Sequence, residues 1–421
     1  MSKLTKYKFS DLYEMSSGIS SSKEQAGHGS PFISFSTVFN NYFLPEELPD
    51  LMDTSLKEQE IFSVKKDDVF ITRTSETVDA LAMSCVAVKD YPKATFSGFV
   101  KRLRPKTTGI VYSKYIAFFL RSKYFRKVLD CNTIMTLRAS FNEDMFSFLH
   151  LYLPDYEEQV RIGDLLYKME MKIRTNNKIN DNLEQQAKLL YDYWFTQFDF
   201  PDENGEPYRS SGGKMVWNEQ LKRTIPDGWT TNPLSDIFTF KSGYSFSSDL
   251  YEVSGKYKLL TIKNVQNNGI NLNVDNYINV LPDNVPDYCL LKAQDILMSL
   301  TGNVGRVGIM YADNCLLNQR VALAEPVNIN QRVFVYFLLK SDIIHKQYEM
   351  IANGSSQQNL SPIEAEKVII AYNPEVATKF STLCNEYLNT IVSNLAENQE
   401  LINIRDWLLP ILMNGQATIS D

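Results

Sequence analysis

Residues 154–195 read PDYEEQVRIGDLLYKMEMKIRTNNKINDNLEQQAKLLYDYWF. Steps of four and three residues reach mostly apolar positions, which are Ile162, Leu166, Met169, Ile173, Asn176, Asn180, Leu183, Ala187, Leu190 and Trp194. This spacing is typical of a coiled-coil seam. Because no Gly or Pro follows Gly163, the segment predicts one long helix of roughly 60 Å. Such a helix needs a partner to bury its apolar stripe.

The partner is a second segment near the C-terminus with the same spacing. Its seam positions are Phe380, Cys384, Tyr387, Ile391, Asn394, Asn398, Leu401, Arg405, Leu408 and Leu412. Two asparagines recur at the same places, and polar residues in a seam are tolerated where they fix register. In an antiparallel pair Asn176 lies level with Asn398, and Asn180 with Asn394, so that the amides can bond each other.

Parallel packing would also match the asparagines. We prefer the antiparallel arrangement because a pseudo-twofold relation between two domains then follows naturally. The alternative is that the helices make separate contacts and carry the asparagines on their surface.

The segments before the two helices also match each other in order and type. The matched pairs are FSDLYEMSSGIS (Phe9–Ser20) with LSDIFTFKSGYS (Leu234–Ser245), ISFSTV (Ile33–Val38) with LTIKNV (Leu260–Val265), DVFITRT (Asp68–Thr74) with DILMSLT (Asp295–Thr301), FSGFVKRLRP (Phe96–Pro105) with LNQRVALAEP (Leu317–Pro326), and SFNEDMFSF (Ser140–Phe148) with NLSPIEAEK (Asn359–Lys367). The loops between them differ most, as expected if two copies of one scaffold bind different targets. The chain is therefore predicted to be an internal duplication.

The predicted fold class is α+β, with two α/β domains in pseudo-twofold repeat joined by two long antiparallel coiled-coil helices. The predicted divisions are a first domain at 1–153, a first helix at 154–198, an exposed linker at 199–225, a second domain at 226–372 and a second helix at 373–414. In the first domain Phe32–Phe39, Asp67–Thr74 and Ala94–Pro105 have strand composition. Ser113–Leu129 has helical spacing, and Asn142 is placed to cap a short helix.

Composition excludes several classes of protein. The chain has 421 residues and a formal net charge of -7, so any DNA contact is expected to be a local basic surface. No apolar run is long enough to span a membrane, and the N-terminus lacks the apolar core of a signal peptide. Five scattered cysteines without a CxxC pair predict a reduced, cytoplasmic setting without structural zinc.

The sequence carries no recognisable catalytic motif. It lacks a Walker-type GxxxxGK[ST], a GxGxxG fingerprint and the Asn/Asp-Pro-Pro-aromatic motif of adenine methyltransferases. Its three histidines lie far apart, and no nucleophile–base arrangement is visible. By elimination we predict a binding protein with no metal or cofactor of its own.

Basic residues of the first domain are candidate DNA contacts, since Lys101–Lys127 is rich in Lys and Arg and contains no acid. The candidates from this run are Lys101, Arg102, Arg104 and Lys106. The alternative is an ordinary solvated helix face and strand end. Arg73 and Thr74 are further candidates because they follow a predicted strand and could contact a guanine edge or a phosphate, and Arg138 is a second loop candidate.

In the second domain the candidates are loop residues with amide, hydroxyl or basic groups, since Asn and Gln bind adenine edges and Arg binds guanine. They are Lys241, Tyr244, Lys263, Asn264, Thr301, Asn303, Arg306, Asn318, Gln319, Arg320, Ser355, Gln357 and Gln358. The alternative is that these residues only form turns, in which Gly, Ser and Asn are also preferred.

The chain resembles the specificity subunit of type I restriction-modification enzymes. The resemblance rests on the two long helices and on TGNVGRVGI (301–309), NQRVAL (318–323), NGSSQQNLSP (353–362) and SSGGKMVWNEQLKRTIPDGW (210–229). The first domain departs from it, because TSETVDALA replaces TGNVGRVGI and RASFNED replaces GSSQQNLSP.

The resemblance implies that each α/β domain is a target recognition domain that reads one half of a split DNA site in the major groove. It implies that the helices act as a spacer and dock two methyltransferase subunits, with restriction/translocase subunits joining the complex. Adenine methylation from S-adenosylmethionine, and ATP- and Mg-dependent cleavage, then belong to the partner subunits. A rigid spacer of this length suits half-sites about one turn of B-DNA apart, ~34–36 Å.

A rival interpretation is a scaffold or regulator that binds proteins through the coiled coil and does not read DNA. Trp194, Phe195 and Trp407 are expected to be exposed, which makes dependence on a partner protein plausible.

Overall fold

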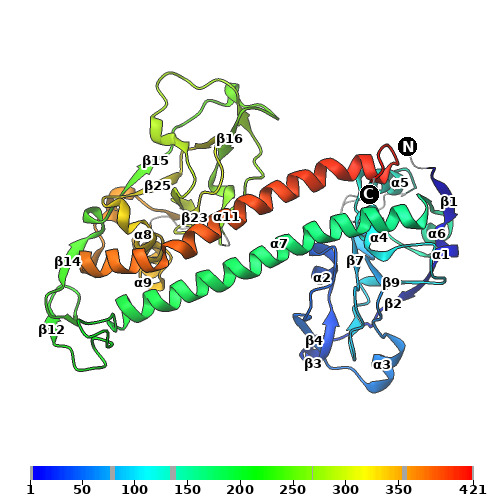
Figure 1. The fold of residues 1–421 in the computed structure, drawn as a ribbon, viewed down its shortest axis with the longest axis horizontal. Coiled ribbons are helices and arrows are strands. Elements are labelled where there is room, and N and C mark those ends of the chain that lie inside the picture. Colours follow the sequence, from blue (N-terminus) through cyan, green and yellow to red (C-terminus); the bar gives the residue numbers. More distant parts are fainter. Residues whose placement is uncertain (1–2, 76–80, 133–138, 268, 353–357, 420–421) are drawn as a thin grey trace. The chain divides into compact units, whose positions relative to one another are not determined.

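The computed structural model describes residues 3–75, 81–132, 139–267, 269–352 and 358–419 (Figure 1). The chain forms two compact units. Unit 1 comprises Met1–Ile173 with Glu400–Asp421, and unit 2 comprises Arg174–Gln399. Each long helix contributes one part to each unit.

A four-stranded antiparallel sheet forms the centre of unit 1. Its order is β2 (Tyr13–Ser17), β9 (Val100–Pro105), β5 (Val69–Thr72) and β7 (Ser84–Val86). The helices α4 (Ser113–Phe119) and α5 (Lys123–Asn132) pack their buried aromatic side chains against it. Ile162, Leu166 and Leu412 from the long helices complete this hydrophobic core.

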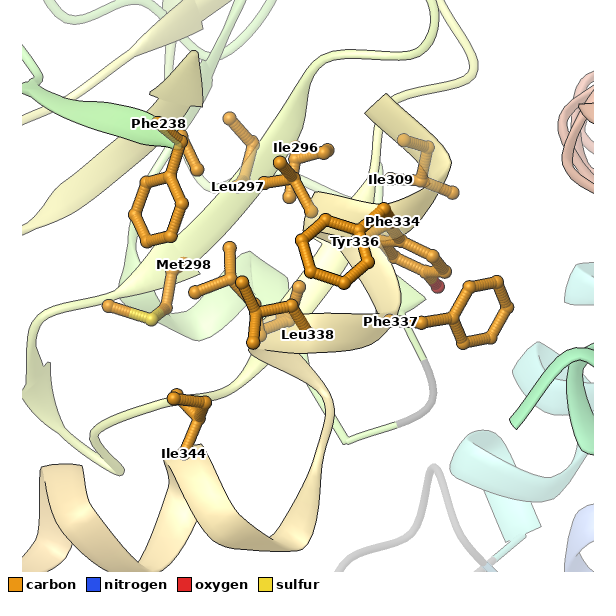
Figure 2. Close-up of a cluster of buried hydrophobic side chains, with 14 of the residues drawn as sticks. Phe238, Ile296, Leu297, Met298, Ile309, Phe334, Tyr336, Phe337, Leu338 and Ile344 are labelled. Carbon is orange, nitrogen blue, oxygen red and sulfur yellow. The ribbon is translucent and has the colours of Figure 1, made fainter. Parts of the chain in front are cut away.

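Unit 2 repeats this arrangement with its own sheet and helices. Its central sheet has the order β15 (Phe238–Ser242), β25 (Val321–Pro326), β21 (Ile296–Ser299) and β23 (Val307–Ile309). The helices α8 (Arg332–Leu339) and α9 (Asp342–Ile351) follow. Figure 2 shows Phe238, Leu297 and Met298 of the sheet close to Phe334 and Leu338 of α8.

The smaller sheets also correspond. In unit 1, β1 (Thr5–Lys8) pairs with β11 (His150–Leu153) and β6 (Thr74–Ser75) with β10 (Ala139–Ser140), both antiparallel, and β3 (Ala26–Ile33) pairs with β8 (Thr95–Phe96) in parallel. The corresponding pairs of unit 2, in the same order and directions, are β14 (Thr230–Pro233) with β27 (Ile369–Tyr372), β22 (Thr301–Gly302) with β26 (Gln358–Asn359), and β16 (Tyr257–Leu260) with β24 (Cys315–Leu317). Pairing and direction agree in these strands, and unit 2 adds β20 (Leu290–Leu291) to its parallel pair together with the separate pairs β12 (Met215–Asn218) with β13 (Arg223–Pro226) and β17 (Val265–Gln266) with β18 (Gly269–Ile270). The predicted duplication is therefore confirmed.

The remaining elements complete the two units. They are α1 (Phe9–Leu12), α2 (Phe35–Asn40), β4 (Asp50–Met52), α3 (Leu56–Ile61) and α6 (Glu143–Phe148) in unit 1, and β12 (Met215–Asn218), β13 (Arg223–Pro226), β17 (Val265–Gln266), β18 (Gly269–Ile270), β19 (Tyr277–Ile278), β20 (Leu290–Leu291) and α10 (Pro362–Glu366) in unit 2, together with short 3-10 turns.

Two long helices, α7 (Tyr156–Tyr191) and α11 (Pro374–Met413), run antiparallel within each unit (Figure 1). In unit 2, Asn176 Nδ2 donates to Asn398 Oδ1 at 2.9 Å, and Asn394 Nδ2 donates to Asn180 Oδ1 at 2.8 Å. In unit 1, Arg405 pairs with Glu170 at 3.3 Å. The amide pairs expected from the sequence are thus present.

Some local predictions were wrong in their boundaries. The strand predicted at Phe32–Phe39 ends at Ile33, where Ser34 caps α2 by accepting from Thr37 N at 3.2 Å. The helix predicted at Ser113–Leu129 is two helices with a break at 120–122. Asn142 caps α6 as predicted and accepts from Met145 N at 2.9 Å.

The segment predicted as an exposed linker is structured. After α7 a π-helical turn, Asp192–Thr196, leads into a chain that buries Phe198 and Phe200 against Trp229, and the β12–β13 hairpin follows. Trp194 and Phe195 are buried against Phe380, which corrects the prediction that they are exposed. Trp407 is 70% exposed, as predicted.

The seam amides generate a stability prediction. Asn398→Ala should lower the free energy of unfolding by about 1–3 kcal/mol, because it removes two hydrogen bonds of the seam, from Asn176 Nδ2 to Asn398 Oδ1 and from Asn398 Nδ2 to Asn177 Oδ1, and leaves Asn176 Nδ2 with Glu397 Oε2 alone as an acceptor. The double variant Asn176→Leu/Asn398→Leu should recover much of this loss, because both polar groups are then removed together. Urea unfolding of the two variants and the parent measures the difference. Equal destabilisation by the single and the double variant would contradict the proposed pairing.

Candidate nucleic-acid interface

Three-residue turns join equivalent strands in the two units, and we call them junction turns. In unit 2 the junction turn is Asn318–Arg320, between β24 and β25. Its backbone is hydrogen-bonded to three other segments: from Asn318 N to Leu260 O (3.1 Å), from Gln319 N to Tyr244 O (3.0 Å), and from Leu300 N to Arg320 O (3.0 Å). The turn therefore ties together the ends of several strands.

The junction turn of unit 1 is Ser97–Phe99, between β8 and β9. It makes the same set of backbone hydrogen bonds: from Ser97 N to Ile33 O (3.0 Å), from Gly98 N to Ile19 O (2.7 Å), and from Arg73 N to Phe99 O (2.9 Å). Because these bonds involve only main-chain atoms, they do not depend on which side chains the turn carries.

A glycine lies against each junction turn. A Cβ atom on Gly18 would overlap the carbonyl oxygens of Phe96 and Ser97, and one on Gly243 would overlap those of Leu317 and Asn318. The SG pair common to SSGIS and KSGYS in the sequence is therefore explained by a close backbone contact, for which only glycine has room.

A further loop joins the turn in each unit. Leu360 N donates to Leu300 O at 2.8 Å, and β22 and β26 pair beyond this bond. In unit 1, Phe141 N donates to Arg73 O at 2.8 Å in the same way. The structure thus gathers at one end of each central sheet the loops that the sequence singled out separately.

The two junction turns carry different side chains. Unit 2 presents Gln319 and Arg320 as exposed groups, and Arg320 has a φ of 72°. Unit 1 has Gly98 and Phe99 at these positions, and Phe99 is 65% exposed. Asn318 is buried, and its Oδ1 accepts from Gln319 N at 2.9 Å, so this side chain shapes the turn.

Other predicted residues of unit 2 have internal partners. Lys241 pairs with Glu325 at 2.5 Å, and Lys263 pairs with Asp275 at 2.9 Å. Asn264 is 4% exposed and donates to the carbonyls of Asn271 and Asn273, so it holds a loop together. Tyr244 lies beside the junction turn and donates to Asn284 Oδ1 at 2.9 Å.

The loop at 301–306 lies next to the junction turn through Leu300. Thr301 donates to Asn359 Oδ1 at 2.9 Å. When the Asn303 side-chain amide is oriented with its oxygen toward Arg306, this oxygen accepts a hydrogen bond from Arg306 Nη2 at 3.1 Å. Gln358 is exposed on β26, whereas Ser355 and Gln357 lie outside the described residues.

Most of the basic candidates of unit 1 stabilise the fold. Lys101 and Arg102 are only 7% and 8% exposed. Lys101 donates to Ser17 Oγ at 2.8 Å, and Arg102 donates to Ser63 O at 2.6 Å. Arg104 forms a bidentate pair with Asp68 at 2.7 and 2.6 Å. Burial lowers the pKa of Arg102, whereas the hydrogen bonds that Arg104 donates to Asp68 raise the pKa of Arg104.

The basic run does not form one phosphate-facing surface. Arg121 donates to the carbonyls of Ser84, Val38, Phe39 and Asn41, and Arg126 to those of Leu81, Ala82 and Leu120. Lys106 donates to Ser10 O at 2.8 Å at the end of β9 away from the junction turn. Arg73, which is exposed, and Thr74 do lie at the turn, and Arg138 is outside the described residues.

Among the residues that the structure describes, no cluster of three or more His, Cys, Asp or Glu could hold a metal ion. The described cysteines Cys85, Cys289, Cys315 and Cys384 are buried and free of disulfides. Burial raises the pKa of Cys315 and of Cys384 to about 11. Within the same described range, none of the helices has the length and apolar character that crossing a bilayer requires.

A family model described as the type I restriction modification DNA specificity domain matches residues 1–185 and 226–372. The chain belongs to this family. The resemblance noted in its motifs is confirmed, and so is the prediction that the chain provides DNA specificity. Each matched range includes one of the two junction turns.

Individual relatives are distant in sequence and similar in length. The chain is 24% identical to the type I restriction enzyme MjaIX specificity subunit of Methanocaldococcus jannaschii, with 98% of this chain and 93% of that one covered. It is 25% identical to the HindI specificity subunit of Haemophilus influenzae, over 91% and 94%. The crystal structure of the type I restriction-modification S subunit from M. genitalium has the same fold, with a TM-score of 0.60, 17% identity and coverage of 98% and 96%.

Sequence reasoning missed Phe99 as a candidate, although the information was available. The alignment of FSGFVKRLRP with LNQRVALAEP places Ser97, Gly98 and Phe99 opposite Asn318, Gln319 and Arg320. The Phe99 side chain carries neither a charge nor an amide, the groups by which base-contacting residues are usually recognised in a sequence.

The double variant Gln319→Ala/Arg320→Ala should weaken binding to cognate DNA at least about tenfold, because a good bidentate base contact discriminates by about 1–3 kcal/mol. Asn318 is left in place because its amide shapes the turn. Fluorescence anisotropy with a cognate duplex measures the affinity, and Lys214→Ala, in an exposed surface pair with Asp227, is the matched control. Unchanged affinity with the double variant would exclude the turn of unit 2 from the interface.

Thiol reactivity tests the burial of the cysteines. With a pKa of about 11, Cys315 and Cys384 carry roughly one part in a thousand of thiolate at pH 8, so iodoacetamide should modify them at least ~100-fold more slowly in the native protein than in urea. Peptide mass spectrometry over time gives both rates. Rapid native labelling of Cys384 would show that the helix seam opens.

Proposed function

We propose that the chain is the non-catalytic subunit that selects a bipartite, asymmetric DNA site for a type I restriction-modification enzyme. The observation that carries this proposal is the repeated junction turn. One backbone arrangement presents Gln319 and Arg320 in unit 2, and Gly98 and Phe99 in unit 1. We call each unit a reader, because it is proposed to recognise one half of the site. Two readers that share one scaffold but carry different exposed side chains would select two different half-sites.

The chemistry of unit 2 suits recognition of base edges. Arg binds the O6 and N7 acceptors of guanine, and Gln binds N6 and N7 of adenine. A turn held by main-chain hydrogen bonds keeps these groups in place before binding, which reduces the entropy lost on complex formation. Tyr244, Thr301 and Gln358 lie around the same turn and extend the proposed surface.

The partners follow from family membership. The relatives are named specificity subunits, so we infer that this chain docks two methyltransferase subunits and, through them, restriction/translocase subunits. Adenine methylation with S-adenosylmethionine and cleavage with ATP and Mg are then reactions of those subunits. The buried free cysteines support a reducing, cytoplasmic setting.

Domain exchange tests the two-reader proposal. In cells that express the chain with a methyltransferase subunit, methylome sequencing should detect a gapped, asymmetric motif with methylated adenines. Exchange of residues 227–372 for those of another family member should change one half of the motif and leave the other. A motif that changes in both halves, or in neither, would contradict the assignment of one half-site to each unit.

Salt dependence separates DNA reading from the scaffold interpretation. Phosphate contacts release counterions, so affinity for cognate duplex should fall by a factor on the order of a hundred or more between ~50 and ~200 mM salt. A scaffold that binds proteins only would show no saturable affinity for DNA at either salt concentration. A complex with methyltransferase subunits but without DNA affinity would favour the scaffold.

A further inference from the structure

Phe99 occupies in unit 1 the position that Arg320 occupies in unit 2. The carbonyl of Phe99 accepts from Arg73 N at 2.9 Å, and that of Arg320 accepts from Leu300 N at 3.0 Å. Both residues are the last of their junction turn, directly before β9 and β25. The equivalence is therefore fixed by hydrogen bonding and by strand register together.

The Phe99 side chain is apolar and open to solvent. It is 65% exposed, and among the described residues it belongs to none of the hydrophobic core clusters and to none of the aromatic ring pairs. Its backbone is held by Arg73 and by Ser97, whose Oγ accepts from Phe99 N at 3.2 Å. An exposed ring on a fixed turn stabilises the fold little, and it is well placed to contact a ligand.

The surroundings of Phe99 fit a DNA groove. Arg73 is exposed beside it, and its Nη1 lies 3.4 Å from Gly98 O. Gly98 has no side chain to cover the ring. A cation next to an isolated apolar group can contact a phosphate while the ring reaches a base edge. The apolar feature that a base presents in the major groove is the C5-methyl group of thymine.

We propose that Phe99 is a specificity-determining residue of unit 1 that selects thymine by packing against its C5-methyl group. This inference rests on the proposed function, since it requires unit 1 to read one half-site. The two halves are then read by different chemistry at one structural position. Arg320 selects by hydrogen bonds, and Phe99 selects by apolar contact.

Replacement of thymine by uracil tests the contact, because uracil differs only by the missing methyl group. The full chain in complex with its methyltransferase subunits is titrated with cognate duplexes in which each thymine of the half-site of unit 1 is replaced in turn. One replacement should weaken binding about fourfold, as expected for one buried methyl group. In Phe99→Ala the same replacement should have no effect, whereas in Arg320→Ala the fourfold loss should persist.

Phe148→Ala is the matched control. Phe148 is 75% exposed and belongs to the same unit. The residue after it, Leu149, accepts a hydrogen bond from Phe9 N at 2.9 Å, and Phe9 precedes β2, whereas the junction turn contacts the chain that follows β2. This variant should retain the full uracil effect. Phe99→Leu keeps an apolar group and should retain part of it.

The outcomes distinguish this inference from the proposed function. If the parent complex binds its site specifically and the uracil effect is absent, or is the same in Phe99→Ala, the thymine contact is wrong while the two-reader function stands. A uniform loss in Phe99→Ala at every duplex would also overturn it, since it indicates a contact without base selection. If the parent shows no preference for its site over unrelated duplex, the proposed function fails, and this inference fails with it.

Discussion

The main-chain hydrogen bonds around the junction turns are the constraint on which the rest of the architecture depends. They tie each turn to three other segments, and they occur with nearly equal lengths in both units. Gly18 and Gly243 permit the close approach that these bonds need. Because no side chain takes part in the shared bonds, the exposed residues of the turn can change while the scaffold remains. A duplicated domain can therefore acquire a second specificity without a new fold.

Charge in this protein is used in two different ways. Lys101, Arg102 and Arg104 donate to the Ser17 hydroxyl, the Ser63 carbonyl and the Asp68 carboxylate. Asp68 is fully buried, and a buried carboxylate needs such donors. Arg73 and Arg320 are exposed at the junction turns. A basic run in a sequence is thus weak evidence for a phosphate-binding surface until the partners of its side chains are known.

The seam of α7 and α11 shows a similar balance between stability and specificity. The buried Asn176–Asn398 pair and the half-buried Asn180–Asn394 pair contribute less than leucines would, but an out-of-register helix would break these hydrogen bonds. Within unit 2 they select one antiparallel register. The seam positions read from the sequence correspond to this register because helical spacing directly determines which residues share a face.

The sequence by itself determined the duplication, the two long helices, the paired asparagines and the family, because periodicity and local motifs are written along the chain. The sequence also indicated which loops of unit 2 are candidates for DNA binding. Tertiary structure decided which of the candidates are exposed: the burial of Lys101 and Asn264, and the packing of Trp194 and Phe195, depend on segments far away in the sequence. It also decided that Phe99 and Arg320 occupy one position. The reason is physical, since a hydrogen bond or a buried contact between distant segments leaves no local pattern in either of them.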